Sequence, residues 1–116
     1  MIQVQIVKSG TNIAGFQISG HAGYAPSGQD IVCAAASFLA IAVINSLEVQ
    51  LGVEGTVKSR DGFLYYRLPV DLQQEQQYTA QIILQTLVIG FQNLKEEYPK
   101  YISIQNLRIK GGALEC

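Results

Sequence analysis

The change from a strand to a helix is encoded in residues 13–44, which read IAGFQISGHAGYAPSGQDIVCAAASFLAIAVI. At the start of this stretch, residues 13–19 alternate in side-chain character and predict a strand with Ala14 and Phe16 on one face. At its end, residues 31–44 are apolar with a single interruption and predict a helix. A loop that contains several glycines therefore joins the end of a strand to the beginning of a helix.

The predicted helix has clear boundaries. Asp30 is a favoured N-cap residue, because its carboxylate can accept hydrogen bonds from unpaired backbone amides and suits the positive end of the helix dipole. We predict that the helix begins there and continues to about Val49, with Gly52 as the stop signal. Apolar residues surround its first three turns, so we expect a buried central helix. Its apolar run is shorter than the roughly 20 residues that span a bilayer, which argues against a membrane protein.

Two predicted hairpins flank this segment. Residues 2–9 alternate between polar and apolar side chains and, after a turn at residues 10–12, pair with the strand that follows. Residues 53–58 and 63–68 predict the second hairpin, because the Asp-Gly pair at positions 61–62 between two strand-like runs is a strong turn signal.

The C-terminal part predicts a helix and a last strand. Residues 72–98 carry apolar side chains at helical spacing, and Pro99 ends the pattern. In the strand at residues 102–109 the apolar side chains change phase, which predicts a bulge or an end to regular pairing near residues 105–106. Residues 111–116 are expected to be a frayed tail.

The predicted order of elements is therefore β-β-α-β-β-α-β. We expect a single domain over residues 1–116 with an α/β fold, in detail an α+β two-layer sandwich, in which two helices pack on one mixed sheet. This arrangement buries the apolar strand faces and both helices at once. The order of the strands within the sheet does not follow from the sequence.

The composition limits the possible partners. Charged residues make up 15% of the chain, against roughly 25% in an ordinary soluble domain, so we expect a partner chain to cover part of the surface. The net charge of -1 argues against the basic surface that direct nucleic-acid binding needs. The N-terminal residues lack the pattern of a signal peptide, so we expect a cytoplasmic protein.

The most informative pair of residues lies on either side of the loop. His21, the only histidine, stands twelve residues before Cys33. In the predicted fold His21 ends a strand and Cys33 is the third residue of a helix, and these two ends meet at one edge of the sheet. The first helical turn favours a thiolate, and a neighbouring imidazole can take the thiol proton and return it to a leaving group. The pair therefore indicates a Cys/His dyad suited to acyl transfer.

Other interpretations of these residues stay open. Cysteine is among the most buried residue types, so Cys33 alone would be interpreted as structural. Asp30 can cap the helix without touching His21, or it can orient the imidazole. Ser37 lies one turn after Cys33 and can support the site or simply donate to the Cys33 carbonyl. Asp30 and Ser37 are therefore supporting candidates.

Cofactor sites are poorly supported by the loop. Gly23 and Gly28 have the spacing of a phosphate-cradling loop, but Gln29 and Asp30 replace the lysine and the hydroxyl residue that such a loop needs. One histidine and two cysteines, one of them the terminal Cys116, are a poor zinc set. An anion at the helix start would meet the negative charge of Asp30. We predict no metal and no cofactor, and we expect both cysteines to be free thiols.

These residues form a motif that resembles the ribosomal-processing cysteine protease family, Prp. The motif begins with Gly20 and His21 and continues with Gly28. The run Asp-Ile-Val-Cys-Ala-Ala at residues 30–35 follows, and Ser37 ends the motif. The predicted order of elements and the length are also similar to that family. The resemblance implies that His21 and Cys33 are the catalytic pair, accompanied by Asp30 and Ser37.

The resemblance also implies a function. It is that of a bacterial cysteine endopeptidase, a thiol protease and hydrolase, that removes the N-terminal extension of a large-subunit ribosomal protein precursor, cleaves beside aromatic residues and supports ribosome biogenesis. Such proteins form homodimers, which agrees with the low charged fraction. The loop is then the candidate for a substrate-gated flap that its glycines allow to move. Its residues are Gly20, Ala22, Gly23, Tyr24, Ala25, Pro26, Ser27, Gly28 and Gln29.

The hypothesis is that Cys33 attacks the scissile carbonyl, that His21 moves the proton, and that amides at the helix start, including that of Cys33, bind the oxyanion. The alternative is a non-catalytic dimeric ribosome-assembly factor whose loop binds a peptide without cutting it. The reactivity of the thiol distinguishes the two. The cleavage site, the residues of the specificity pocket and the open or closed state of the loop without substrate do not follow from the sequence.

Overall fold

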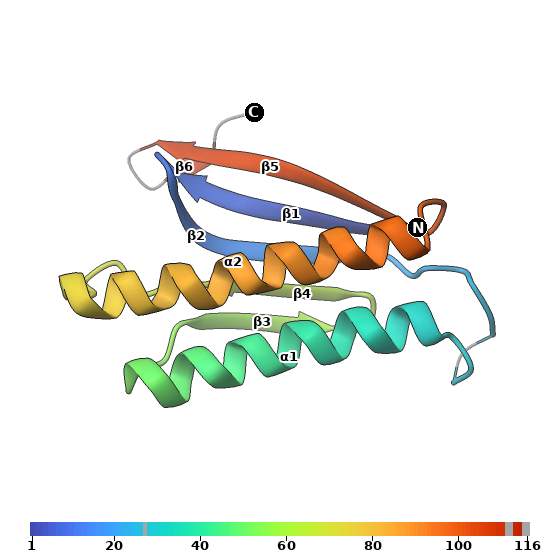
Figure 1. The fold of residues 1–116 in the computed structure, drawn as a ribbon, viewed down its shortest axis with the longest axis horizontal. Helices are drawn as coiled ribbons and strands as arrows, with labels where there is room; N and C mark the ends of the chain where they lie inside the picture. The colour runs from blue at the N-terminus through green and yellow to red at the C-terminus, as the bar shows by residue number, and fades with distance from the viewer. Residues whose placement is uncertain (27, 111–112, 115–116) are drawn as a thin grey trace.

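The computed structural model describes residues 1–26, 28–110 and 113–114. Its elements in chain order are β1 (Ile2–Ser9), β2 (Asn12–Ser19), α1 (Ile31–Leu51), β3 (Thr56–Arg60), β4 (Phe63–Arg67), α2 (Gln74–Glu97), β5 (Ile102–Lys110) and β6 (Ala113–Leu114) (Figure 1). The predicted order β-β-α-β-β-α-β is confirmed, and the short strand β6 follows it.

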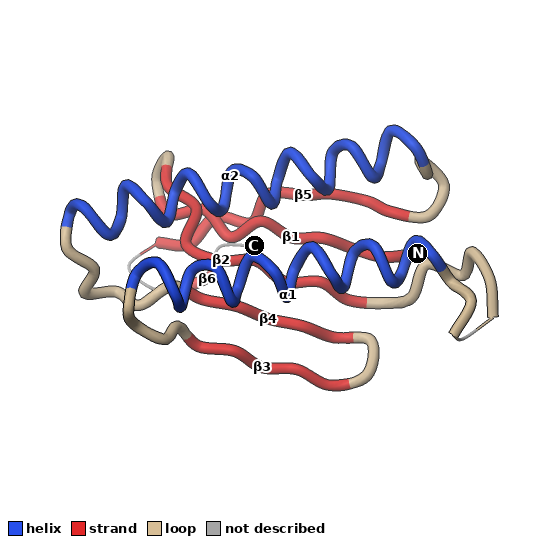
Figure 2. Tube along the Cα trace, turned by 60° about the horizontal axis from the view of Figure 1, so that its bottom comes forward, coloured by secondary structure: helices blue, strands red, loops and turns tan. Residues whose placement is uncertain are grey.

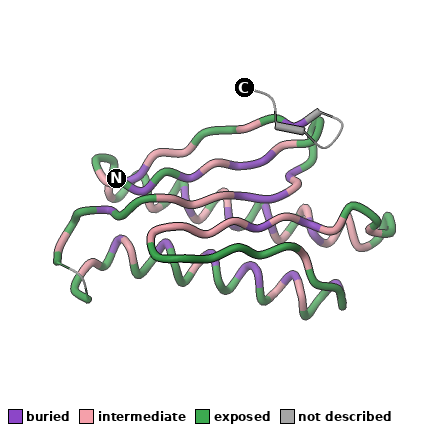
Figure 3. Tube along the Cα trace, turned by 180° about the vertical axis from the view of Figure 1, so that it is seen from behind, coloured by how far each residue is buried: buried purple, intermediate pink, exposed green. Residues whose placement is uncertain are grey.

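The strands form one mixed sheet in the order β3-β4-β2-β1-β5-β6. β1 pairs antiparallel with β2 and parallel with β5, so strands from the two ends of the chain are neighbours. Both helices cover the same face of the sheet (Figure 2), and no helix of the described residues lies on the opposite face (Figure 3). The predicted arrangement of two helices on one mixed sheet is confirmed. The strand order adds that β4 lies directly beside β2.

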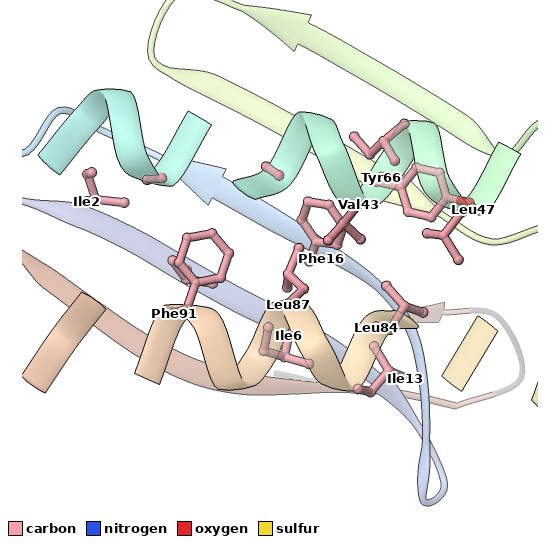
Figure 4. Close-up of a cluster of buried hydrophobic side chains, with 14 of the residues drawn as sticks. Ile2, Ile6, Ile13, Phe16, Val43, Leu47, Tyr66, Leu84, Leu87 and Phe91 are labelled. Atoms are coloured by element: carbon pink, nitrogen blue, oxygen red, sulfur yellow. The ribbon is translucent and has the colours of Figure 1, made fainter. Parts of the chain in front are cut away.

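The core lies between the sheet and the two helices. Ile6 and Phe16 point into this core from the sheet. They meet Leu47 from α1 and two side chains from α2, Leu84 and Phe91 (Figure 4). Each of these five side chains is at most 1% exposed. Burying one large apolar side chain away from water contributes about 1.5–3 kcal/mol to the free energy of unfolding. This packing fixes α1 on the sheet and thereby fixes the position of its first turn.

α1 begins where the sequence predicts. The Asp30 carboxylate accepts a hydrogen bond from the Cys33 amide at 2.9 Å and caps the helix. At the other end Gly52 adopts a φ of 71°, a left-handed conformation that favours glycine, and its amide donates to the Glu48 carbonyl. The helix continues slightly further than predicted, to Leu51.

The expectation that α1 is buried on all sides is wrong. Its side chains towards the sheet are buried, but Ile31, Phe38, Ile41 and Val49 are exposed, Phe38 by 77%. A two-layer sandwich covers only the sheet-facing side of each helix, and nothing in the described part of the chain covers the outer side of α1. Among the described residues, α1 is also the one helix whose length and composition would allow it to cross a membrane, a property shared by core helices of soluble proteins.

The prediction of a bulge or an end to regular pairing near residues 105–106 is also wrong. β5 pairs with β1 without a break from Ile102 to Arg108. The apolar side chains change phase because Leu107 lies opposite Val7 on the sheet face away from the helices, and Val7 is buried there. β5 thus places apolar side chains on the helix-facing side in its first half and on the opposite side in its second half.

A register shift occurs instead between β1 and β2. Lys8 lies opposite Ile13 rather than Ala14, so Ala14 is the extra residue of a bulge in β2. The regular alternation predicted for residues 13–19 is therefore interrupted at Ala14, and Ile13 is buried in the core.

The second hairpin and the second helix are as predicted, with small changes at their ends. Asp61 and Gly62 form the turn between β3 and β4, and β3 begins at Thr56. α2 begins with a capping box between Gln73 and Gln76, and it ends two residues before Pro99. The predicted frayed tail is wrong for residues 113–114, which pair with β5 as β6. Cys116 lies outside the described residues.

Candidate active site

Three segments meet at one end of the sheet. They are the C-terminal end of β2, the N-terminal turn of α1 and the turn between β3 and β4 (Figure 1). β2 delivers His21, α1 delivers Cys33, and the hairpin turn contributes Asp61. The strand-to-helix loop connects the first two of these segments.

Cys33 lies in the first turn of α1 and is half-buried. Its sulfur accepts a hydrogen bond from the amide of Ala22 at 3.2 Å, across the loop. A sulfur atom at a helix N-terminus that also accepts a backbone N–H lies where negative charge is favoured. The position therefore suits a thiolate nucleophile.

His21 leaves the end of β2 with a side chain that is 63% exposed. Its Nε2 lies 3.9 Å from Oδ2 of Asp61. His21 and Cys33 line the same two hollows, and among the described residues no hydrogen bond joins the imidazole to the thiol. The structure thus brings the predicted pair to one groove without direct contact.

The two hollows differ in character and meet at the predicted pair. One, of about 260 Å³, has a wall of apolar side chains that includes Ile18, Ile41 and Leu64. The other lies under the loop and is lined by smaller and more polar residues such as Gly23 and Asp30. A peptide that passes over the thiol would have an apolar hollow on one side and the loop on the other. Four residues line both hollows: His21, Cys33, Ser37 and Asp61.

Asp30 caps the helix and also holds the loop. Besides the Cys33 amide, its carboxylate accepts hydrogen bonds from the amides of Tyr24 at 3.0 Å and Ala25 at 3.4 Å. The bond from the Cys33 amide is the largest cause that lowers the pKa of this carboxyl below its ordinary value. Among the described residues Asp30 makes no contact with His21 that would orient it.

The Cys33 amide is already used by this cap. The hypothesis that this amide binds an oxyanion therefore does not fit, because its hydrogen is directed at Asp30. The Ala22 amide, which points at the sulfur, lies closer to the place where an oxyanion would form. Ser37 is exposed, and its hydroxyl makes no hydrogen bond within the described ranges, to the Cys33 carbonyl or to any other group.

The loop is anchored at its first half. Ala22 is 5% exposed, and the ring of Tyr24 contacts the rings of Tyr98 and Tyr101 edge-on, at centroid distances of 5.5 and 5.2 Å. Gly23 and Gly28 adopt positive φ angles, which allow the chain to turn at each end of the loop. Pro26 accepts a hydrogen bond from Gln29 through its carbonyl, and Ser27 lies outside the described residues.

Sequence reasoning identified His21 and Cys33 but missed Asp61 and the tyrosine pair. Asp61 was recognised only as part of a turn, because nothing local in the sequence shows that β4 lies beside β2. Tyr98 and Tyr101 follow α2 and reach Tyr24 only through the fold. Within the described ranges no group of three metal-binding side chains occurs.

The comparisons with known proteins agree with this arrangement. The profile of the family described as "Cysteine protease Prp" matches residues 1–103. The ribosomal processing cysteine protease Prp of Bacillus subtilis is 29% identical over 112 residues, which cover 94% of this chain and 96% of that protein. Two crystal structures of Prp from Staphylococcus aureus are similar, and each comparison covers 91% of this chain and 99% of the other. The one with a covalently linked product peptide has a TM-score of 0.81 at 29% identity, and the one with a substrate peptide has 0.75 at 27%.

Proposed function

The chain belongs to the cysteine protease Prp family, and on this premise we propose that it removes the N-terminal extension of a large-subunit ribosomal protein precursor. It acts in the cytoplasm, as a cysteine endopeptidase with a Cys33–His21 dyad that cleaves beside aromatic residues. The relatives with this name are ribosomal processing proteases, and two of their structures hold a substrate or product peptide. The observation that carries the proposal is the half-buried Cys33 sulfur at a helix N-terminus, in a groove that it shares with the only histidine.

In the acylation half of the reaction, the Cys33 sulfur forms a bond to the scissile carbonyl carbon while its proton passes to His21. The negative charge that develops on the carbonyl oxygen lies near the sulfur, where the Ala22 amide is available as a donor. When the tetrahedral intermediate collapses, the C–N bond breaks and the imidazolium gives its proton to the leaving amine. The shortened ribosomal protein leaves with a new N-terminus, and the extension stays bound as a thioester.

In the deacylation half, His21 takes a proton from a water molecule as the water attacks the thioester. The C–S bond then breaks, the extension leaves as a carboxylic acid, and the thiol is restored. His21 must therefore approach Cys33 in the working complex. The imidazole is 63% exposed and the loop that begins beside it turns at glycines, which leaves room for this movement.

The apolar hollow beside the thiol supports the proposed preference for aromatic residues. Its volume of about 260 Å³ and its wall of Ile18, Ile41 and Leu64 suit one large apolar side chain. A peptide whose aromatic residue enters this hollow would present the adjacent carbonyl to Cys33.

The decisive experiment uses a peptide that carries the extension and the first residues of the mature ribosomal protein. We expect the wild-type protein to cut it once, and the Cys33→Ala and His21→Ala proteins to bind but not to cut it, as measured by mass spectrometry. Ser9→Ala, a small change at an exposed residue that lines neither hollow, is the control. Undiminished cleavage by Cys33→Ala would refute the mechanism.

The alternative, a peptide-binding assembly factor without catalysis, makes a different prediction for the thiol. For the protease, iodoacetamide near neutral pH alkylates Cys33 faster than it alkylates free cysteine, and His21→Ala slows the reaction. The measurement needs a Cys116→Ser background, so that a second thiol does not contribute. A Cys33 that stays unmodified with and without the peptide would favour the binding factor.

The outer side of α1 supports the proposal that the protein is a homodimer. Six residues on this side, all apolar except Asn45, recur at steps of four and three, the spacing at which two helices pack along a seam. All are exposed, and the series is Ile31, Ala35, Phe38, Ala42, Asn45 and Val49. Small side chains at positions 35 and 42 would allow a second copy of α1 to approach closely. The uncovered apolar area is of the kind that marks a protein interface.

A further inference from the structure

We propose that Asp61, on the turn between β3 and β4, is a positioning residue for His21. The proposal rests on the proposed protease function, and it extends the Cys33–His21 pair by a carboxylate.

The register of β2 and β4 places the two residues opposite each other. Ser19 pairs with Phe63, and the next position continues the ladder through a hydrogen bond of 2.9 Å from the Gly20 amide to the Gly62 carbonyl. One step further in the same antiparallel register, His21 faces Asp61. The two side chains therefore meet because of the backbone pairing, and Nε2 lies 3.9 Å from Oδ2.

The turn is shaped to leave room for the imidazole. A Cβ atom at Gly62 would lie 2.9 Å from Nε2 of His21, closer than side-chain carbons normally approach. Gly62 also adopts a φ of 69°, so glycine is favoured there for its backbone as well. The ring of His21 thus rests against a glycine, and the carboxylate of the preceding residue lies at its edge.

The other charged groups near His21 are engaged in other contacts, so Asp61 is the carboxylate available to the imidazole. The Asp30 carboxylate already accepts three backbone N–H groups in the cap and the loop. The guanidinium of Arg60 lies over the ring of Phe63, 4.3 Å from its centroid. Asp61 is therefore the carboxylate that faces the imidazole among the described residues of this groove.

The geometry also distinguishes the two nitrogens of His21. Nε2 is the ring nitrogen that faces Asp61, at an ion-pair distance of 3.9 Å, so Nδ1 remains for exchange with the Cys33 thiol. When a bound peptide excludes water from the groove, the attraction between imidazolium and carboxylate increases, because the effective dielectric constant falls. Asp61 would then hold the ring in the orientation that the reaction uses.

The first test compares Asp61→Ala with Asp71→Ala. Asp71 is an exposed carboxylate on the connection from β4 to α2, outside both hollows, and serves as the matched control. We expect Asp61→Ala to lower kcat about tenfold while KM stays within about twofold, because a misplaced base affects the chemical step more than binding. Asp61→Asn, whose amide oxygen can still accept from Nε2, should restore part of kcat.

The second test uses two glycines with the same backbone strain. Gly62→Ala and Gly10→Ala both place an alanine at positive φ, of 69° and 60°, but a Cβ at Gly10 meets nothing within 4 Å. We expect similar losses of thermal stability in the two variants and a loss of kcat only in Gly62→Ala. A Gly62→Ala protein as active as Gly10→Ala would contradict the contact with His21.

A third measurement needs no peptide substrate. In a Cys116→Ser background, Asp61→Ala should slow alkylation of Cys33 in the same direction as His21→Ala does, and Asp71→Ala should not. Equal alkylation rates and equal kcat in Asp61→Ala and Asp71→Ala would overturn the proposal. If the wild-type protein cuts no precursor peptide, yet alkylation depends on Asp61, the proposed function fails while the positioning role stands.

Discussion

At the scale of single residues, Asp30 links the nucleophile to the loop. Its carboxylate accepts from the amide of Cys33 within the helix and from the amides of Tyr24 and Ala25 in the loop. One side chain thus sets where α1 begins and how the first half of the loop is held against it. A change at Asp30 should therefore affect both stability and the path of the loop.

The stabilising effect of Asp30 should depend on pH. Hydrogen bonds, above all that from the Cys33 amide, lower the pKa of this carboxyl in the folded protein below its ordinary value of 3.8. A lowered pKa means that the stabilisation is complete above the ordinary pKa and is lost as the pH falls through the folded value. We expect Asp30→Asn to lower Tm near neutral pH, with a difference from wild type that shrinks below pH 3.8.

Thermal unfolding followed by circular dichroism over this pH range measures the effect. Asp71→Asn removes an exposed carboxylate with no hydrogen bond among the described residues and is the control. A difference between Asp30→Asn and wild type that stays constant at all pH values would show that the carboxylate charge is not involved.

The residue type and its position sufficed to predict the cap at Asp30, because capping depends on the next three residues only. The same local reasoning could not separate a capping role from contact with His21, and only the structure shows that the carboxylate is fully used by backbone amides. The role of Asp61 could not be predicted, because its contact with His21 is not local. Its neighbour His21 is forty residues away in the sequence, and the contact depends on which strands pair.

At the scale of elements, α1 has two apolar sides, one buried and one exposed. The side that carries Ala36, Ala40 and Leu47 packs on the sheet and on α2, and the side that carries Phe38 faces outward. The sequence predicted the helix and its ends well because caps and periodicity are local. It predicted burial on all sides, because apolar residues facing the core and apolar residues facing outward look alike in a sequence.

The outward side of α1 gives a prediction for self-association. Phe38→Glu places a charge in the centre of the apolar seam, so we expect it to convert a homodimer into a monomer with unchanged helical content. The mass in solution, measured by light scattering after gel filtration, reports the change. Val70→Glu is the control, because Val70 is 93% exposed and lies outside the seam. A wild-type protein that is monomeric at micromolar concentration would contradict the proposed dimer.

At the scale of the whole molecule, stability depends on the layer between the helices and the sheet. Phe91 of α2 is completely buried in this layer (Figure 4), so Phe91→Ala should lower the free energy of unfolding by about 3–5 kcal/mol through lost burial and a cavity. Tyr78→Ala changes an aromatic residue of the same helix that is 72% exposed, and it should have a much smaller effect. Urea unfolding followed by circular dichroism compares the two.

The fold class followed from the sequence because a strand-helix pattern of this kind has few ways to bury its apolar faces. The strand order did not, because pairing across the sheet is a non-local choice among apolar strands of similar character. For β5, the change of phase was interpreted as a bulge or an end to regular pairing, while the strand is regular and Leu107 lies opposite the buried Val7 on the far face of the sheet. Apolar side chains on both faces of an edge region cannot be assigned to a layer before the neighbouring strands are known.

The parallel pairing of β1 with β5 has a consequence for how the protein folds. β1 pairs with β2, which follows it directly in the chain, and also with β5, whose partner residues lie one hundred positions later. Contacts between such distant segments slow folding, since a long loop must close first. The sheet on which α1 and the Cys33 groove rest is therefore completed by a pairing between segments one hundred residues apart, Ile2 with Ile102.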